Sequence, residues 1–170
     1  MPNTNFRSTC TIATSLDLLG DKWSLLILRD MLLHKKSTFK EFLNSKEKIA
    51  SNILTNRLVY LIENGFISKL NLKGTKKSAR FIATRKGVCA LPLLIELYLL
   101  TIEEFSKDVL NDSQIAIKAE IQKDRDLFIS TRREAYIKFS FQLESDTIAN
   151  QKSKLLLEDR SALPKKTKHS

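Results

Sequence analysis

The chain has 170 residues, and its 29 Lys and Arg residues against 19 Asp and Glu give a formal net charge of +10. A hydrophobic fraction of 42% excludes a wholly disordered protein. No apolar run approaches the ~20 residues of a transmembrane helix, and the first residues lack the apolar segment of a signal peptide, so we expect a cytoplasmic protein that binds no membrane. Two cysteines, two histidines and four glycines offer little material for a metal centre, a catalytic histidine or a phosphate loop. We therefore expect no metal, no cofactor and no enzymatic activity.

The positive charge is concentrated in one part of the chain. Residues 35–86 contain 13 basic and three acidic residues, so this window alone carries +10. From residue 101 onward, 13 basic residues meet 12 acidic ones and nearly cancel. Such a local excess is typical of a surface that binds a polyanion, most simply nucleic acid, although a solvated basic face without a partner has the same composition.

The first part of the chain predicts two adjacent helices. After a flexible lead over residues 1–8, apolar side chains at helical spacing indicate a helix over residues 9–19, which Gly20 ends. Asp21 can cap a second helix over residues 22–33. Because this second helix is apolar on all sides, we expect it to lie at the centre of the core.

A short third helix and a longer fourth helix follow. Thr38 and Glu41 have the spacing of a capping box at the start of the third helix. The fourth helix is expected over residues 51–64, with Gly65 at its end. Its apolar face would carry Leu54, Leu58, Leu61 and Ile62, and its opposite face Asn52, Thr55, Asn56 and Val59.

The remaining chain predicts a hairpin and further helices. Residues 66–72 and 79–83 have the pattern of two extended strands, joined by a turn over residues 73–78 that carries three lysines. A fifth helix runs from about Lys86 past Phe105, with a kink at Pro92. Its wide apolar surface indicates a second subunit as cover. We assign residues 9–105 to the domain, 106–149 to a helical C-terminal arm and 150–170 to a disordered basic tail.

This order of elements is that of a winged helix-turn-helix domain, a mainly α fold (α+β) with a two-stranded basic wing. The third helix and the turn over residues 45–50 would deliver the fourth helix into a major groove ~12 Å wide. Helices at both ends of the domain would provide dimerisation elements. The charge window and the predicted shape agree on double-stranded DNA as the partner.

The stretch from Cys10 to Leu100 resembles the HxlR-type winged-helix transcriptional regulators. The similarity lies in LDLLGDKWSLLILRDML from Leu16, TFKEFL from Thr38, KIASNILTNRLVYLIENGFI from Lys48 and FIATRKGVCALP from Phe81, with Cys10 ahead of them. It implies a DNA-binding regulator that lacks catalysis.

The sequence departs from the family pattern at positions close to the DNA. Thr38 replaces an arginine, and Ala50 replaces a serine ahead of the recognition helix, so Ser51 is expected to take over the cap. The tryptophan common after the proline of the fifth helix is missing, with Tyr98 nearby. The resemblance therefore implies nothing about the operator sequence.

Three groups of candidate site residues follow. Arg57 matches the arginine of the family segment, and we expect it either to contact DNA or to pair with Glu63 or another acid. The resemblance implies that Cys10 can act as a redox or electrophile sensor. A reactive thiolate needs positive neighbours or a helix start, and Cys10 lies near a helix start. The alternative is that Cys10 is an inert residue in a dimer interface, as we expect for Cys89. The DNA-binding candidates are Lys48, Ser51, Asn52, Thr55, Asn56, Arg57, Lys73, Lys76, Lys77 and Arg80, and the dimer-interface candidates are Ile12, Leu16, Leu94, Leu97 and Tyr98.

Two functions remain open at this point. The first is a homodimeric, sequence-specific DNA-binding transcriptional regulator, which would respond to thiol oxidation or to a ligand between the long helices; the sequence identifies no small-molecule effector. The second is a winged-helix interaction module whose basic face binds an acidic protein. Strong discrimination between an operator and random duplex would separate them.

Overall fold

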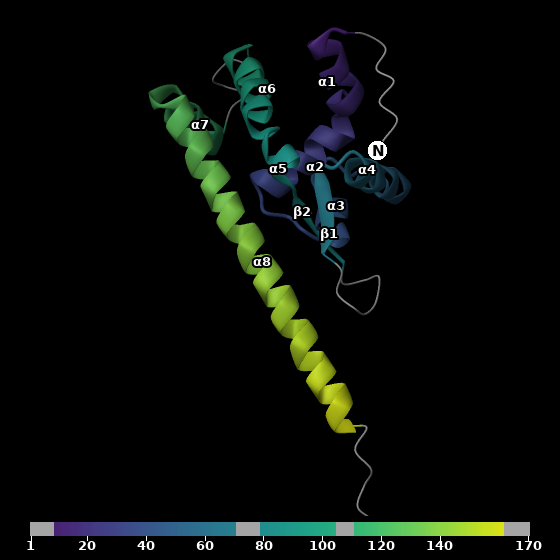
Figure 1. Ribbon diagram of the computed structural model, residues 1–170. Coiled ribbons are helices and arrows are strands. Elements are labelled where there is room, and N and C mark those ends of the chain that lie inside the picture. The colour runs from purple at the N-terminus through teal and green to yellow at the C-terminus, as the bar shows by residue number, and fades with distance from the viewer. Residues whose placement is uncertain (1–8, 71–78, 105–110, 162–170) are drawn as a thin grey trace, which may run out of the picture.

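The computed structural model describes residues 9–70, 79–104 and 111–161, and its element order is that of a winged helix (Figure 1). None of the helices in these ranges is both long and apolar enough to cross a membrane. The predicted fold class is confirmed: a mostly helical chain with one two-stranded antiparallel sheet. In chain order, the elements are α1 (Thr11–Leu19), α2 (Lys22–Leu32), α3 (Phe39–Leu43), α4 (Ser51–Glu63), β1 (Ile67–Leu70), β2 (Arg80–Ala83), α5 (Arg85–Val88), α6 (Leu91–Glu104), α7 (Asp112–Lys123) and α8 (Arg125–Ser161).

Side-chain caps fix where α2 and α3 begin. The Asp21 carboxylate accepts hydrogen bonds from the amides of Trp23 (3.2 Å) and Ser24 (2.9 Å). Thr38 and Glu41 form the expected capping box, in which each side chain accepts from the backbone amide of the other residue. These bonds satisfy amides that the first turn of a helix leaves without partners, so both predicted helix starts are confirmed.

The sheet is joined to the start of α3. β1 and β2 pair in antiparallel register, with Ile67 opposite Ala83 and Leu70 opposite Arg80. On its other edge, β2 meets residues 37 and 38: the amide of Phe81 donates to the carbonyl of Ser37 at 2.7 Å. The two predicted strands are confirmed over these ranges, and the basic turn predicted over residues 73–78 lies outside the described residues.

The core is built around α2, as its all-round apolar sequence predicts. Leu28 and Met31 are completely buried, and they share one hydrophobic cluster with Leu54 of α4, Leu91 of α6 and Ile121 of α7. α2 is in contact with α1, α4, β2, α6 and α8. It therefore supports both the N-terminal elements α1, α4 and β2 and the later helices α6 and α8.

Three predictions about the helices after the sheet are wrong. The predicted fifth helix is two helices, because Thr84 caps the short α5 by accepting from the amide of Gly87, and a new helix begins at Leu91. Pro92 is the second residue of α6, where a missing amide costs no hydrogen bond, so it does not interrupt a long helix. The helical arm expected over residues 106–149 is divided at Asp124, whose backbone is extended (φ −159°, ψ 95°), into α7 and α8.

Two further expectations differ from the structure. Ile62, placed on the apolar face of α4 by its spacing, is 36% exposed at the edge of the buried stripe. The backbone of α8 continues to Ser161, into the segment 150–170 for which composition favoured disorder. α8 extends past the sheet and beyond the rest of the molecule (Figure 1).

The C-terminal helices share the core of the winged helix. Phe128, Ile129 and Tyr136 of α8 are buried in the same cluster as α2 and the sheet. The hydroxyl of Tyr136 accepts a hydrogen bond from the amide of Ala83 at 2.7 Å. Burial of this hydroxyl raises the pKa of Tyr136 to about 12. A buried hydrogen bond therefore joins α8 to the last residue of β2.

Candidate nucleic-acid interface

One face of α4 carries the polar side chains that the sequence assigned to base contacts. Asn52, Thr55 and Asn56 are exposed. Leu54 and Leu58, which lie on the opposite face of the same helix, are buried against the core. The helix is thus held by its apolar face while short polar side chains, which suit contacts to base edges, face outward.

The beginning of α4 differs from the prediction that Ser51 caps the helix. Ala50, with an extended backbone (φ −68°, ψ 142°), is the N-cap residue and offers no side-chain bond, so Ser51 is already helical. The carbonyl of Ser51 accepts a hydrogen bond from the Thr55 hydroxyl at 2.8 Å. Lys48 lies just ahead, exposed and with a positive φ of 54°. A helix start without a side-chain cap and with a lysine beside it has the chemistry that suits a DNA phosphate.

Arg57 contacts an acid of its own chain. Its guanidinium lies 3.5 Å from the carboxylate of Asp21 and 5.4 Å from the centre of the Tyr60 ring. Of the two expectations for this residue, the structure contains the pairing with an acid, although with Asp21 rather than Glu63. A DNA contact by Arg57 remains a prediction.

The wing candidates are only partly described. Arg80 is half-buried in β2, and its guanidinium donates to the hydroxyl of Ser37 at 3.1 Å. Lys73, Lys76 and Lys77 lie outside the described residues. Of the predicted DNA-binding set, the structure thus brings together Lys48, Ser51, Asn52, Thr55 and Asn56 at the first turns of α4 and the approach to it.

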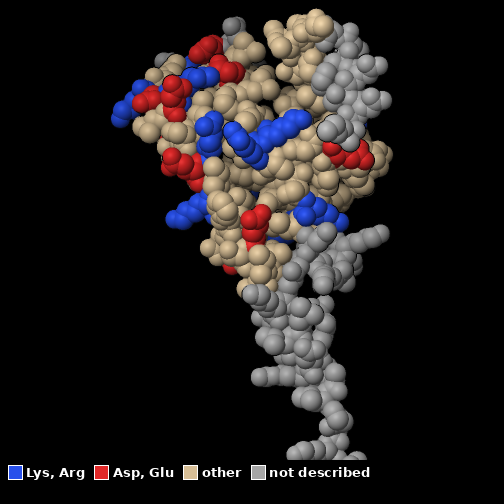
Figure 2. All heavy atoms as spheres, viewed as in Figure 1, with Lys and Arg blue, Asp and Glu red and all other residues tan. Residues whose placement is uncertain are grey.

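Some of the basic residues counted in the charge window serve the fold. Lys86 donates to the carbonyl of Asn64 at 2.9 Å and lies 4.4 Å from the centre of the Phe66 ring, at the C-terminal end of α4. Lys36 donates to the carboxylate of Asp30 at 2.7 Å. On the face drawn in Figure 2, basic and acidic side chains are interspersed. The charge window therefore does not by itself mark out a basic patch on this face.

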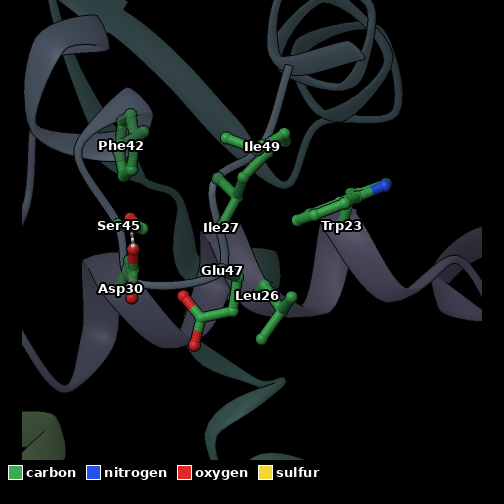
Figure 3. Close-up of a pocket in the computed structure, with 8 residues that line it drawn as sticks. All are labelled: Trp23, Leu26, Ile27, Asp30, Phe42, Ser45, Glu47 and Ile49. Carbon is green, nitrogen blue, oxygen red and sulfur yellow. Dashed lines mark hydrogen bonds between the residues drawn. The ribbon is translucent and has the colours of Figure 1, made fainter. Parts of the chain in front are cut away.

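A buried carboxylate, which the sequence reasoning missed, fixes the turn ahead of α4. Asp30, whose side chain is 4% exposed, accepts from Lys36 and from Arg29, each at 2.7 Å, and from the hydroxyl of Ser45 (Figure 3). Arg29 also donates to Glu47 at 2.7 Å. The second half of α2 is thus tied to the segment between α3 and α4. The signal in the sequence was an acid in the middle of the apolar second half of α2, directly after Arg29.

The electrostatics of this cluster favour the charged form of Asp30. Burial alone would raise the pKa of Asp30, but the hydrogen bonds from Lys36, Ser45 and Arg29 outweigh it and hold that pKa below its ordinary value. The pocket beside the cluster has a volume of about 10 Å³, which is room for about one water. The junction between α2 and the turn is therefore closely packed.

Cys10 is exposed at the N-cap position of α1. The amides of Ala13 and Ile12 hold the pKa of its thiol below the ordinary value. Cys89 is also exposed and lines a cleft between α1 and α6. In the described residues, no group of three or more His, Cys, Asp or Glu side chains could hold a metal ion.

The dimer-interface candidates divide into two sets. Ile12 and Leu16 of α1 are 70% and 61% exposed, and with Leu97 of α6 they line the α1–α6 cleft, which has a volume of about 680 Å³. Leu94 is instead buried in the core. Tyr98 is half-buried, and its hydroxyl donates to the carbonyl of Gln114 at 2.8 Å. Leu94 and Tyr98 therefore stabilise the fold of the chain itself and do not belong to its exposed apolar surface.

Comparisons with known proteins agree with this geometry. The model of the HxlR-like helix-turn-helix family matches residues 18–108. YdeP of Bacillus subtilis (strain 168), described as an uncharacterized HTH-type transcriptional regulator, is 30% identical over 111 residues, which cover 65% of this chain and 84% of that protein.

Solved structures with the same fold are also known. The putative transcription factor PA1607 is 31% identical with a TM-score of 0.55, over 62% of this chain and 72% of that one. A putative MarR-family regulator from Porphyromonas gingivalis W83 is 21% identical with a TM-score of 0.50, over 58% of this chain and 95% of that one, and supports the fold alone. The family and its curated relative are transcriptional regulators and not enzymes. With a family match over more than half of its length, the chain belongs to the HxlR-like helix-turn-helix family of DNA-binding transcriptional regulators.

Proposed function

We propose that the protein is a homodimeric transcriptional regulator that reads a specific DNA sequence with α4. The observation that carries this proposal is the exposed polar face of α4, formed by Asn52, Thr55 and Asn56 above the buried Leu54 and Leu58. An asparagine amide bonds an adenine edge through two hydrogen bonds, which discriminates among base pairs in the major groove. Lys48 and the uncapped amides at the start of α4 would hold a phosphate and set the register of the helix.

The test is selection of bound sequences from a random duplex pool, followed by affinity measurements at physiological salt. We expect the selected sequence to be bound more tightly than random duplex by orders of magnitude. Asn52→Ala and Asn56→Ala should each reduce this discrimination by about 1–3 kcal/mol. Lys48→Ala should weaken binding to both duplexes, and Gln142→Ala, an exposed change on α8, should alter neither. Equal binding of all duplexes would contradict the proposal and favour an acidic protein as the partner of the basic face.

We propose that α1 and α6 form the dimer interface. Supporting it, Ile12, Leu16, Leu97 and Leu100 are 40–70% exposed on these two helices, and a cleft lies between the helices. Large apolar side chains that gather in this way are typical of a surface covered by a partner. Two copies related by a two-fold axis would place their α4 helices on half-sites about one helical turn, ~34 Å, apart.

The oligomeric state tests this interface. Light scattering coupled to gel filtration should show a dimer for the natural chain and a monomer for the double variant Leu16→Glu/Leu97→Glu. The control is Leu127→Glu/Ile148→Glu, which introduces the same two charges at apolar residues that are 61% and 53% exposed on α8 and should leave the dimer intact. A dimer in both variants would show that the dimer interface does not involve Leu16 and Leu97.

We propose that Cys10 makes the regulator responsive to oxidants or electrophiles. Its exposure and its lowered pKa at the start of α1 favour the thiolate, which is the reactive form. α1 also carries Ile12 and Leu16, so modification of Cys10 would act beside the proposed dimer interface.

The measurement is operator affinity before and after treatment with a thiol oxidant and after re-reduction. Oxidation should change the affinity of the natural chain and of Cys89→Ser, but not that of Cys10→Ser. Identical affinity for the oxidised, reduced and Cys10→Ser proteins would rule out a thiol switch at this position.

A further inference from the structure

A second, larger cleft lies away from α4, where the end of α2 meets the C-terminal helices. It has a volume of about 810 Å³, within the range of small-molecule sites. Ile95 and Tyr98 of α6, Ile117 of α7 and Phe128 of α8 line its apolar part. α7 and α8 lie beyond residues 18–108, so the family match does not describe this cleft.

The charged side chains of the cleft carry a positive excess. Arg29, Lys36, Lys46 and Arg132 line it together with only two acids, Asp30 and Glu47. Arg29 and Lys36 engage both acids at 2.7 Å, so two cations of the cleft remain to attract an anion.

The remaining cations are weakly held. No side-chain hydrogen bond or ion pair engages Lys46 among the described residues. Arg132 reaches the exposed carboxylate of Glu120 only at 3.5 Å, while its guanidinium lies 4.8 Å from the centre of the Phe128 ring. An exposed pair of that length adds little, so the guanidinium is available to a better acceptor at the edge of the apolar surface.

We propose that this cleft binds an organic anion with an apolar body, such as an aromatic or aliphatic carboxylate or sulfonate. The apolar body would lie against Ile95, Ile117 and Phe128, and the acid group would accept hydrogen bonds from Arg132 and Lys46. A neutral apolar compound would lack the hydrogen bonds to Arg132 and Lys46, and a small inorganic anion would lack the apolar contact.

The position of the cleft links it to α4. Arg29 and Glu47 form part of its wall, and the same two residues, with Asp30, tie α2 to the turn ahead of α4. Lys46 directly precedes Glu47 in that turn, so an anion bound by Lys46 and Arg132 would shift the turn and alter the presentation of α4. This regulatory consequence rests on the proposed DNA-binding function, whereas binding of the anion does not.

The test uses the full-length chain and 1-anilinonaphthalene-8-sulfonate, an aromatic anion whose fluorescence rises in apolar sites. Its neutral counterpart, N-phenyl-1-naphthylamine, has the same ring system without the sulfonate. We expect saturable binding of the sulfonate with an affinity at least about tenfold higher than that of the neutral compound, as charge-assisted hydrogen bonds predict.

A charge-matched pair of variants locates the site. Lys46→Gln/Arg132→Gln should weaken sulfonate binding by about tenfold or more. The control, Lys123→Gln/Arg133→Gln, removes the same charge from exposed residues that do not line the cleft, and should bind as the natural chain does. Unchanged thermal unfolding of both variants would show that they fold. Equal affinity of the sulfonate for the two variants would overturn the proposal, and this is the result expected if the sulfonate occupies only the α1–α6 cleft. Equal binding of the sulfonate and the neutral compound to the natural chain would also overturn it.

Operator binding with saturating sulfonate tests the regulatory link separately. A change in operator affinity in the natural chain and in Lys123→Gln/Arg133→Gln, but not in Lys46→Gln/Arg132→Gln, is the expected result. An unchanged affinity despite saturation would overturn the link, and a chain that selects no operator would refute the DNA-binding proposal while leaving the fluorescence result standing.

Discussion

At the scale of single residues, Asp30 determines how the segment ahead of α4 is held. Removing a carboxylate from water is costly, and Asp30 is compensated by bonds from Lys36, Arg29 and Ser45. Two of these partners come from the segment 36–45, which leads through α3 toward α4. One side chain of α2 thus sets the position of a segment up to 15 residues further along the chain.

We expect Asp30→Asn to lower the free energy of unfolding by about 2–3 kcal/mol at pH 7, because Lys36 and Arg29 lose an ionic acceptor in a mostly buried site. The measurement is urea denaturation. Asp126→Asn is the control, since that side chain is 93% exposed and its removal should cost less than about 0.5 kcal/mol. Equal losses in the two variants would contradict the role assigned to Asp30.

The same variant has a defined pH dependence. Because the folded pKa of Asp30 is lowered, its stabilising contribution is complete above the unfolded pKa of about 3.9 and is lost as the pH falls through the folded value. The difference in stability between the natural chain and Asp30→Asn should therefore stay constant from pH 7 to about 5 and shrink below about pH 4. A difference that grows on acidification would contradict this assignment.

At the scale of elements, the short α5 explains why α6 begins where it does. Gly87 is buried, and a Cβ atom placed there would lie 2.1 Å from the carbonyl oxygen of Phe66. This close approach lets α5 fold back under the end of α4, where Lys86 also binds the carbonyl of Asn64. The chain then turns into α6 rather than continuing as one helix.

Gly87→Ala should lower the free energy of unfolding by about 1–3 kcal/mol, since the methyl group collides with backbone rather than with a movable side chain. Thermal and urea unfolding give the value. Gly65→Ala provides a contrast: a Cβ there meets nothing within 4 Å, but the φ of +71° costs about 1 kcal/mol for alanine. Gly65→Asn should recover part of that loss, because asparagine tolerates this conformation, whereas Gly87→Asn should be worse than Gly87→Ala. Full stability of Gly87→Ala would contradict the packing of α5.

At the scale of the whole molecule, α7 and α8 extend the winged helix into a larger unit. Ile121, Phe128, Ile129 and Tyr136 are buried with the core that α2 organises. Without these helices, the apolar surface that they cover on α2, α6 and β2 would face water. We therefore expect the family-matched part of this chain to be less stable on its own than in the full-length protein.

A chain that ends at residue 110 should be less stable by several kcal/mol, since each buried apolar side chain contributes about 1.5–3 kcal/mol. Where the shortened chain does not fold at all, Tyr136→Phe measures the same contact in the full-length protein. It leaves the buried amide of Ala83 without its acceptor and should cost about 1–3 kcal/mol in urea denaturation. Tyr98→Phe, whose lost partner is a carbonyl nearer the surface, should cost less. Unchanged stability in both the shortened chain and Tyr136→Phe would show that α7 and α8 do not stabilise the domain.

The sequence by itself determined the features that depend on near neighbours along the chain. Caps such as Asp21 and the Thr38–Glu41 pair act within three residues, so they identify helix starts directly. Alternating apolar residues predicted β1 and β2, and helical spacing separated the polar face of α4 from Leu54, Leu58 and Leu61. These local signals, in their order, were sufficient to predict the winged-helix fold and the exposed polar face of α4.

Only the tertiary structure decided which charged residues are engaged within the chain and which face outward. Arg57 pairs with Asp21, Lys86 binds the end of α4, and Ser45 reaches Asp30, each across a separation along the chain that no periodicity encodes. Tyr136 meets Ala83 across 53 residues. Such contacts follow from how the elements pack in three dimensions. The break before α6, the union of α7 and α8 with the core and the cleft between α2 and the C-terminal helices therefore could not be predicted from residue spacing.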